Sequence, residues 1–180
     1  LAQAALIAKR AKAISFESLV SSSMKRALQT ATEIAQYTGH KLEQSDLFRE
    51  IQPPLSVAGP PDSGEKRAAI EEYRTAWKES AGDPDWQYED QETTRQFLLR
   101  SIAALRFLEE RPENSLMVVS HGNMIRALVG QVLTSQTLSA EQFANLRWCL
   151  QLTNTGLTVI RYTEEGWKLL TYNDHAHFAE

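Results

Sequence analysis

The sequence of 180 residues predicts an α/β fold: a three-layer α/β/α sandwich whose sheet is mostly parallel, with an antiparallel hairpin at the C-terminus. Two segments, 14–37 and 116–133, each run from an apolar strand through a short polar turn into a helix. The hairpin is predicted from residues 155–162 and 167–172, two strand-like segments separated by the turn signal Thr163-Glu164-Glu165-Gly166. Since no repeat or domain boundary is visible, we expect residues 1–180 to form a single domain.

The first half of the chain predicts two helices around a strand. Residues 1–12 are rich in Ala and contain no helix breaker, and a short strand ends the segment 14–20. The triplet Ser21-Ser22-Ser23 is typical of a helix start, because serine side chains accept hydrogen bonds from free main-chain N–H groups. Residues 24–37 then place apolar side chains at helical spacing, and a brief extended segment, 42–47, follows.

The middle of the chain is expected to form a lid. Residues 52–64 contain four prolines and two glycines, which exclude regular structure and favour a surface loop. A polar helix over 65–80 and a turn-rich connector over 82–90 follow. We expect this insert, 52–90, to contact the variable part of a substrate above the edge of the sheet. The longest helix is predicted over 91–110, and Ser139 with Gln142 marks one further helix start.

Composition narrows the classes of function. A net charge of −4 and the absence of a dense basic run give no support for nucleic-acid binding. The apolar runs are too short for a membrane span, so we expect a cytoplasmic protein with neither nucleic acid nor membrane as a partner. The single cysteine, Cys149, excludes an internal disulfide framework, and its apolar neighbours predict a buried side chain.

Candidate chemistry lies where the two predicted strands end. His121 follows the apolar run Leu116-Met117-Val118-Val119 and precedes a helix, and free N–H groups at a helix start attract anions. The first unit places Ser22 and Arg26 in the equivalent position, and a guanidinium fork suits a phosphate group. The alternative is structural: a histidine that fills a turn and a solvated arginine on a capped helix.

These segments together resemble the histidine phosphatase superfamily, also called the phosphoglycerate mutase-like family. SSSMKRALQTATEIA is similar to its second signature, DLFRE (46–50) to its acidic segment, and VVSHGNMIRAL to its second-histidine segment. Asn154 and Asn173-Asp174-His175-Ala176-His177 resemble its closing landmarks. The order and spacing of these motifs fit over essentially the whole chain.

The resemblance implies a site for a small phosphorylated substrate, with inorganic phosphate or vanadate as further ligands. Arg26 is expected to clamp the phosphoryl group, and His121 to polarise it during transfer. Glu50 is the expected proton donor to the leaving oxygen, with Asp46 as its rival. The pocket walls are expected from Ser22, Gly122 and Asn123. No metal or organic cofactor is expected, since His175 and His177 lack a third ligand nearby in sequence.

Three departures from the family pattern qualify this function. The family's nucleophile is the histidine of an Arg-His-Gly segment, and no such segment occurs here, so we expect the strand that carries it upstream of Leu1. Ser23 stands where proline is usual. The segment 51–59 lacks the motifs that follow the acidic residue in the mutases, which favours a phosphatase. A phosphate-binding relative without catalysis and a phosphoglycerate-type mutase stay as alternatives.

Overall fold

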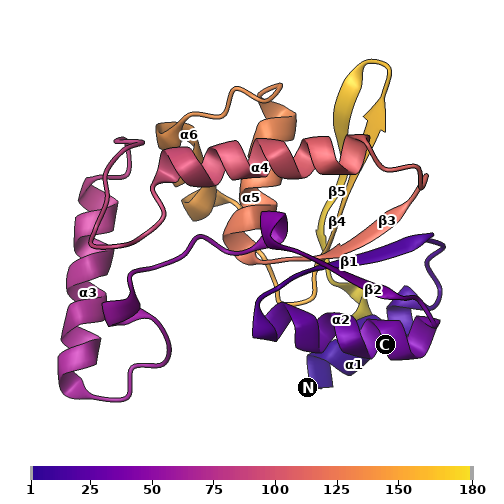
Figure 1. Ribbon diagram of the computed structural model, residues 1–180, viewed down its shortest axis with the longest axis horizontal. Helices are drawn as coiled ribbons and strands as arrows, with labels where there is room; N and C mark the ends of the chain where they lie inside the picture. Colours follow the sequence, from indigo (N-terminus) through magenta and orange to yellow (C-terminus); the bar gives the residue numbers. More distant parts are fainter. Residues whose placement is uncertain (1, 179–180) are drawn as a thin grey trace.

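The computed structural model describes residues 2–178, and a three-stranded parallel sheet lies at its centre (Figure 1). Strand β1 (Ser18–Ser22) is the middle strand, between β2 (Leu42–Ser45) and β3 (Leu116–Val119). Helix α2 (Lys25–Thr38) connects β1 to β2, as a parallel pair requires, because the chain must return to the starting edge. The carboxyl ends of all three strands therefore lie at one edge of the sheet.

One face of the sheet is covered by the N-terminal helices. Helices α1 (Ala2–Ala11) and α2 pack on Leu19 of the central strand, and Ile7 and Ile34 are their largest buried contributors. Met117 and Val119 of β3 join the same cluster, because alternate residues of a strand point to one face. This confirms the first of the predicted helical layers.

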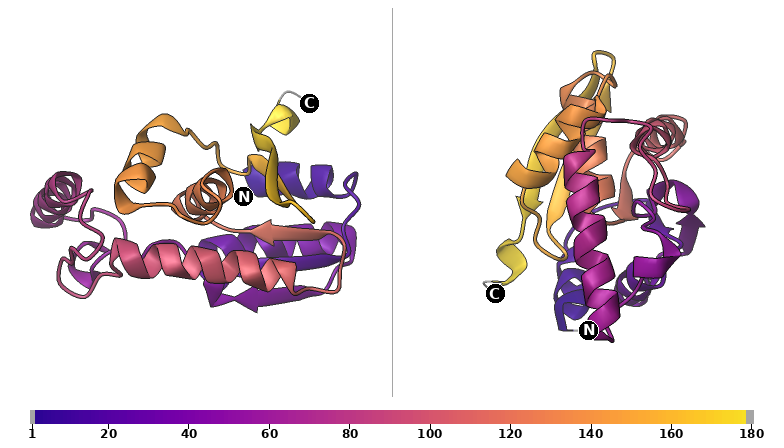
Figure 2. Two further views of the ribbon diagram at one scale, coloured as in Figure 1. Left: turned by 90° about the horizontal axis from the view of Figure 1, so that it is seen from above. Right: turned by 90° about the vertical axis from the view of Figure 1, so that its left-hand side faces the viewer.

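The opposite face is covered by helices from the second half of the chain. Val20 and Val118 point into a cluster with α4 (Thr94–Glu109) and α5 (Gly122–Leu133). Figure 2 shows α1 and α4 on opposite sides of β3. Phe97 of α4 and Met124 of α5 are completely buried there. The three-layer α/β/α arrangement predicted from the sequence is confirmed. No helix among residues 2–178 is long and apolar enough to span a bilayer.

The C-terminal strands form the predicted antiparallel hairpin as a separate sheet. Strands β4 (Leu157–Thr163) and β5 (Gly166–Asp174) pair across a two-residue turn, and Gly166 adopts a positive φ of 94°. Among residues 2–178, no strand pairs with the outer edge of β3. All four residues of β3 are therefore only half-buried, whereas its sequence predicted a buried strand.

The segment 52–90 extends away from the sheet. It contains a 3-10 turn (Leu55–Val57) and helix α3 (Gly64–Glu79), which has no fully buried residue. Figure 1 shows α3 standing to one side of the sheet, beyond the end of α4. Its polar sequence is consistent with that exposure, because a helix that buries little apolar surface needs no continuous apolar stripe. That this segment acts as a lid stays a prediction.

Two local predictions were wrong. Ser21 and Ser22 belong to β1, and α2 begins after Met24, which caps it without a side-chain hydrogen bond. The serine triplet therefore continues a buried strand rather than starting a helix. Cys149, at the end of α6 (Ala140–Cys149), is exposed rather than buried, because the apolar neighbours that suggested a core position lie around the exposed end of a helix. By contrast, the helix start at Ser139 with Gln142 is confirmed as a capping box.

Candidate active site

The N-termini of two helices meet at one edge of the sheet. Strands β1 and β3 are parallel neighbours, with Ser21 opposite Val119, and each leads almost directly into a helix. Helix α2 begins at Lys25 and α5 begins at Gly122. The first N–H groups of a helix have no partner within the helix, so this edge combines two partial positive charges. Such an edge favours an anion.

Three predicted side chains form a hydrogen-bonded chain there. Nε of Arg26 donates to Nδ1 of His121 over 2.9 Å, and Nε2 of His121 lies 2.8 Å from Oγ of Ser22. A guanidinium can only donate, so Nδ1 accepts and the imidazole proton is on Nε2, directed at the serine. Ser22 and His121 are buried, whereas the Arg26 side chain is exposed. The exposed part of the guanidinium can therefore bind an anion while its Nε holds the histidine.

His121 is uncharged at neutral pH. Burial lowers the pKa of its imidazole most, and the positive charges of Arg26 and Arg100 lower it further, to about 4. A neutral imidazole is also what the hydrogen bond from Arg26 requires. An anion bound beside His121 would offset these positive charges and raise the pKa of the imidazole toward its ordinary value.

The carboxylate of Glu50 lies at the first turn of α5. Its Oε2 accepts a hydrogen bond from the main-chain N–H of Asn123, and Oε1 accepts from that of Ile51, each over 3.1 Å. The rival carboxylate, Asp46, accepts a hydrogen bond from the hydroxyl of Ser23 instead. Both carboxylates lie near the strand ends, but of the two it is Glu50 that is hydrogen-bonded to the helix beginning next to His121.

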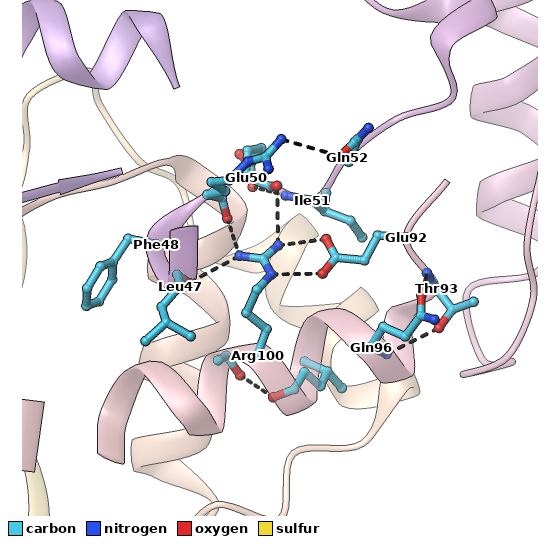
Figure 3. Close-up of polar contacts among 12 residues, drawn as sticks. Leu47, Phe48, Glu50, Ile51, Gln52, Glu92, Thr93, Gln96 and Arg100 are labelled. Carbon is cyan, nitrogen blue, oxygen red and sulfur yellow. Dashed lines mark hydrogen bonds and ion pairs between the residues drawn. The ribbon is translucent and has the colours of Figure 1, made fainter. Parts of the chain in front are cut away.

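Arg100 of α4 holds the loop that carries Glu50, a contact that the sequence did not reveal (Figure 3). Its Nε and one terminal nitrogen donate to the carboxylate of Glu92 over 2.8 and 2.6 Å. Its other terminal nitrogen donates to the carbonyl oxygens of Leu47 and Arg49 over 3.1 and 2.7 Å. Because these acceptors are main-chain atoms, no pattern of side chains in the sequence pointed to Arg100.

Arg147 of α6 is a second residue that the sequence analysis missed. Its Nε donates to Oδ1 of Asn123 over 3.1 Å, and its guanidinium carbon lies 3.1 Å from the ring centre of Trp77 on α3. The side chain therefore connects the insert to the first turn of α5. The only signal of Arg147 in the sequence was a charged residue within an apolar segment.

Gly122 has little free space, since a Cβ added there would lie 3.1 Å from the Nη1 atom of Arg126.

The remaining histidines lie outside this cluster. His40 stacks on Phe16, and its Nε2 lies 2.8 Å from the Phe16 carbonyl oxygen. His177 is buried, and its Nε2 is hydrogen-bonded to the hydroxyl group of Thr155 over 3.0 Å. Asn173 accepts a hydrogen bond from the main-chain N–H of Thr153, next to Asn154. Residues 2–178 contain no cluster of His, Cys, Asp and Glu that could hold a metal ion.

The family model of the histidine phosphatase superfamily (branch 1) matches residues 1–175. The chain belongs to this superfamily, as its motifs indicated. Among curated relatives, "Uncharacterized phosphatase PhoE" of Bacillus subtilis is 27% identical over 169 residues, covering 93% of this chain and 76% of the relative. "Probable phosphoglycerate mutase GpmB" of Shigella boydii serotype 18 is also 27% identical, over 97% of this chain and 79% of the relative.

Solved structures share the fold. Mycobacterial glucosyl-3-phosphoglycerate phosphatase in complex with inorganic phosphate is 22% identical, with a TM-score of 0.71 over 98% of this chain and 86% of that one. The same mycobacterial enzyme was also solved with vanadate. The alpha-ribazole phosphatase of Shigella flexneri is 19% identical, with a TM-score of 0.70 over 96% of this chain and 81% of that one. At these identities the likeness concerns the fold.

Proposed function

We propose that this protein hydrolyses phosphate monoesters through a phosphohistidine intermediate. The observation that carries the proposal is the pairing of Arg26 with a neutral His121 where α2 and α5 begin. Phosphoryl transfer depends on positioning and on neutralising charge at the phosphoryl oxygens more than on further covalent chemistry. A guanidinium, an Nε2–H donor and two helix N-termini at one sheet edge supply those groups.

Each site residue has a role in this proposal. Arg26 binds two phosphoryl oxygens through its terminal guanidinium nitrogens, and a third oxygen replaces the hydroxyl of Ser22 as the acceptor of the Nε2–H of His121. Ser22, which is hydrogen-bonded to His121, and Gly122 line the same pocket. Asn123 lines the side of the pocket next to Glu50, and its main-chain N–H donates a hydrogen bond to the Glu50 carboxylate.

The nucleophile is proposed to come from an Arg-His-Gly strand upstream of Leu1. Its imidazole nitrogen forms a bond to phosphorus while the ester P–O bond breaks, and protonated Glu50 gives its proton to the leaving oxygen. Water then attacks the phosphohistidine, losing a proton to Glu50, and phosphate leaves. The unpaired outer edge of β3 supports this proposal, because a further strand added there would end beside His121.

The comparisons support a phosphatase. The similar solved structures include proteins named as phosphatases. One of them was solved with inorganic phosphate and with vanadate, which are the ligands expected for this site. The test is the natural protein, whose N-terminus is first determined by peptide mass mapping. We expect vanadate-sensitive hydrolysis of small phosphoesters and an acid-labile phosphoenzyme. Absence of turnover on every small phosphoester, with Arg-His-Gly present upstream, would contradict the proposal.

Non-catalytic phosphate binding is the second candidate, and it is favoured by the exposed guanidinium of Arg26 beside two helix N-termini, which can bind an anion without a nucleophile. It predicts that calorimetry detects phosphate binding to the natural protein without turnover. Trapping of a phosphoenzyme would exclude it. The mutase alternative rests on relatives named as probable phosphoglycerate mutases and predicts a requirement for priming by a bisphosphate.

A further inference from the structure

Besides Arg26, two arginines lie beside the first turn of α5. Arg147 reaches Asn123 with its Nε, and Nη1 of Arg126 lies close to Gly122. Nε of Arg126 donates to the carbonyl oxygen of Leu150 over 2.7 Å. Both side chains are half-buried, so water screens their charges only in part.

Most other half-buried arginines are paired with a carboxylate. Arg10, Arg100 and Arg111 each form such an ion pair, whereas Arg49 bonds to the side-chain amide of Gln52. Among residues 2–178, neither Arg126 nor Arg147 has a carboxylate at ion-pair distance. A buried charge is costly unless it is paired, so this region has an excess of positive charge.

The pKa of Arg147 is affected by this excess of positive charge. Burial lowers the pKa of its guanidinium most, the charges of Glu50 and Tyr73 raise it, and Arg126 lowers it again, to about 10 overall. Glu50 is the carboxylate that acts on Arg147, yet both of its oxygens already accept main-chain N–H groups. An added anion would offset the repulsion between the two arginines.

Arg147 lies close to Glu50, the residue proposed to protonate the leaving group, because both bond to Asn123. Asn123 links the two groups, because its main-chain N–H bonds to Glu50 and its side chain bonds to Arg147. In the proposed function Glu50 protonates the leaving oxygen, so the alcohol part of a substrate would extend past Asn123. The guanidinium of Arg147 also lies against the ring of Trp77, a cation–π contact that helps to hold it in place.

We infer that Arg147, supported by Arg126, forms a second anion-binding subsite that takes a carboxylate or a second phosphate on the alcohol part of the substrate. The inference rests on the proposed function for the direction of the leaving group. The substrate class is then a phosphate monoester with a further anionic group. Within residues 2–178, neither terminal nitrogen of the Arg147 guanidinium donates to a protein acceptor. Both are therefore available to bind the two oxygens of one anion.

Binding of non-hydrolysable phosphonates to the natural protein tests the inference. Three ligands are compared by calorimetry: benzylphosphonate, meta-carboxybenzylphosphonate and the corresponding meta-bisphosphonate. We expect at least one of the two doubly anionic ligands to bind on the order of tenfold more tightly than benzylphosphonate, as for one charge-assisted pair. Which of them binds more tightly distinguishes a carboxylate subsite from a phosphate subsite.

The Arg147→Gln variant is expected to remove this preference, and Arg147→Lys to retain part of it. If Arg147 only stabilised the local structure, Arg147→Gln would instead lower the affinity for all three ligands equally. Arg161→Gln is the matched control, because Arg161 is an exposed arginine on the hairpin. Equal affinities in the wild type, a preference that survives Arg147→Gln, or no binding of any phosphonate would overturn the inference. Vanadate-sensitive turnover of phenyl phosphate, measured separately, decides the proposed function.

Discussion

Nε of Arg26 donates to Nδ1 of His121 over 2.9 Å, so the cation proposed to clamp a phosphoryl group also fixes the tautomer of the imidazole. One hydrogen bond thereby sets two properties of the site. The remaining proton of His121 is on Nε2, and the exposed side of the guanidinium is available to a ligand. The site is ordered by contacts among its own residues.

Replacing Arg26 by Ala is expected to lower kcat on phosphoesters by about 10²- to 10³-fold, the usual loss when a transition-state donor is removed. The melting temperature should change little, because the side chain is exposed. Steady-state kinetics and thermal unfolding of the natural protein measure both. Gln29→Ala, an exposed change on the same helix, is the control. Wild-type turnover in Arg26→Ala would remove Arg26 from the site.

Stability should depend on pH through His121. Its pKa of about 4 in the folded protein lies below the ordinary value of 6.5, so the unfolded chain binds the proton more tightly. The free energy of unfolding therefore falls as pH falls from 6.5 to 4, by about 2 to 3 kcal/mol from this group. Urea unfolding at pH 7 and pH 4.5 should show a smaller loss in His121→Asn. An equal loss in both proteins would contradict the assigned pKa.

The two rival carboxylates can be separated by leaving group. Glu50→Gln is expected to lower kcat/KM by about 10²- to 10³-fold on alkyl phosphates, which need a proton donor. The loss in kcat/KM should be much smaller on para-nitrophenyl phosphate, whose leaving group needs none, because kcat/KM does not include the later attack of water. Asp46→Asn removes a carboxylate bonded to Ser23 and should show no such dependence on the leaving group. The opposite pattern would assign the proton donor to Asp46.

Arg100 and Glu92 should be coupled in both stability and activity. Each side chain is only 19% exposed, and breaking such a pair leaves a charge without its partner. Arg100→Ala is expected to lower the free energy of unfolding by about 2 to 4 kcal/mol and to lower kcat by displacing the Glu50 loop. A double-mutant cycle with Glu92→Ala measures the coupling. Arg95→Ala, which breaks the exposed pair with Asp85, should lower the free energy of unfolding far less, because water screens that pair.

The candidate-site residues that the sequence predicted lie where secondary structure changes. Ser22, Arg26 and His121 were singled out because strand-to-helix transitions leave a local pattern of apolar and polar residues, and the structure brings these three side chains together. Residues that act through tertiary contacts left no such pattern. Arg100 was missed since its acceptors are carbonyl oxygens about fifty residues away, and Arg147 since its partners come from α3 and α5.

The same distinction applies to the fold. The helices and the hairpin follow from periodicity and turn residues, and their predicted order was confirmed. The serine triplet does not start a helix because Ser21 and Ser22 continue a buried strand, where their hydroxyl groups are satisfied by hydrogen bonds. The half-burial of β3 depends on which strands lie beside it, a property that four residues of sequence cannot encode.

The pairing of β1 with β3 has a consequence for how the protein folds. Arg26 and His121 are 95 residues apart in the chain, and Glu50 and Asn123 are 73 apart. Contacts between such distant residues require closure of long loops, which slows folding and delays these contacts relative to the helices. A refolding chain should therefore regain its helical circular dichroism signal before it regains phosphate binding. The ability to bind an anion would mark the last cooperative stage of folding.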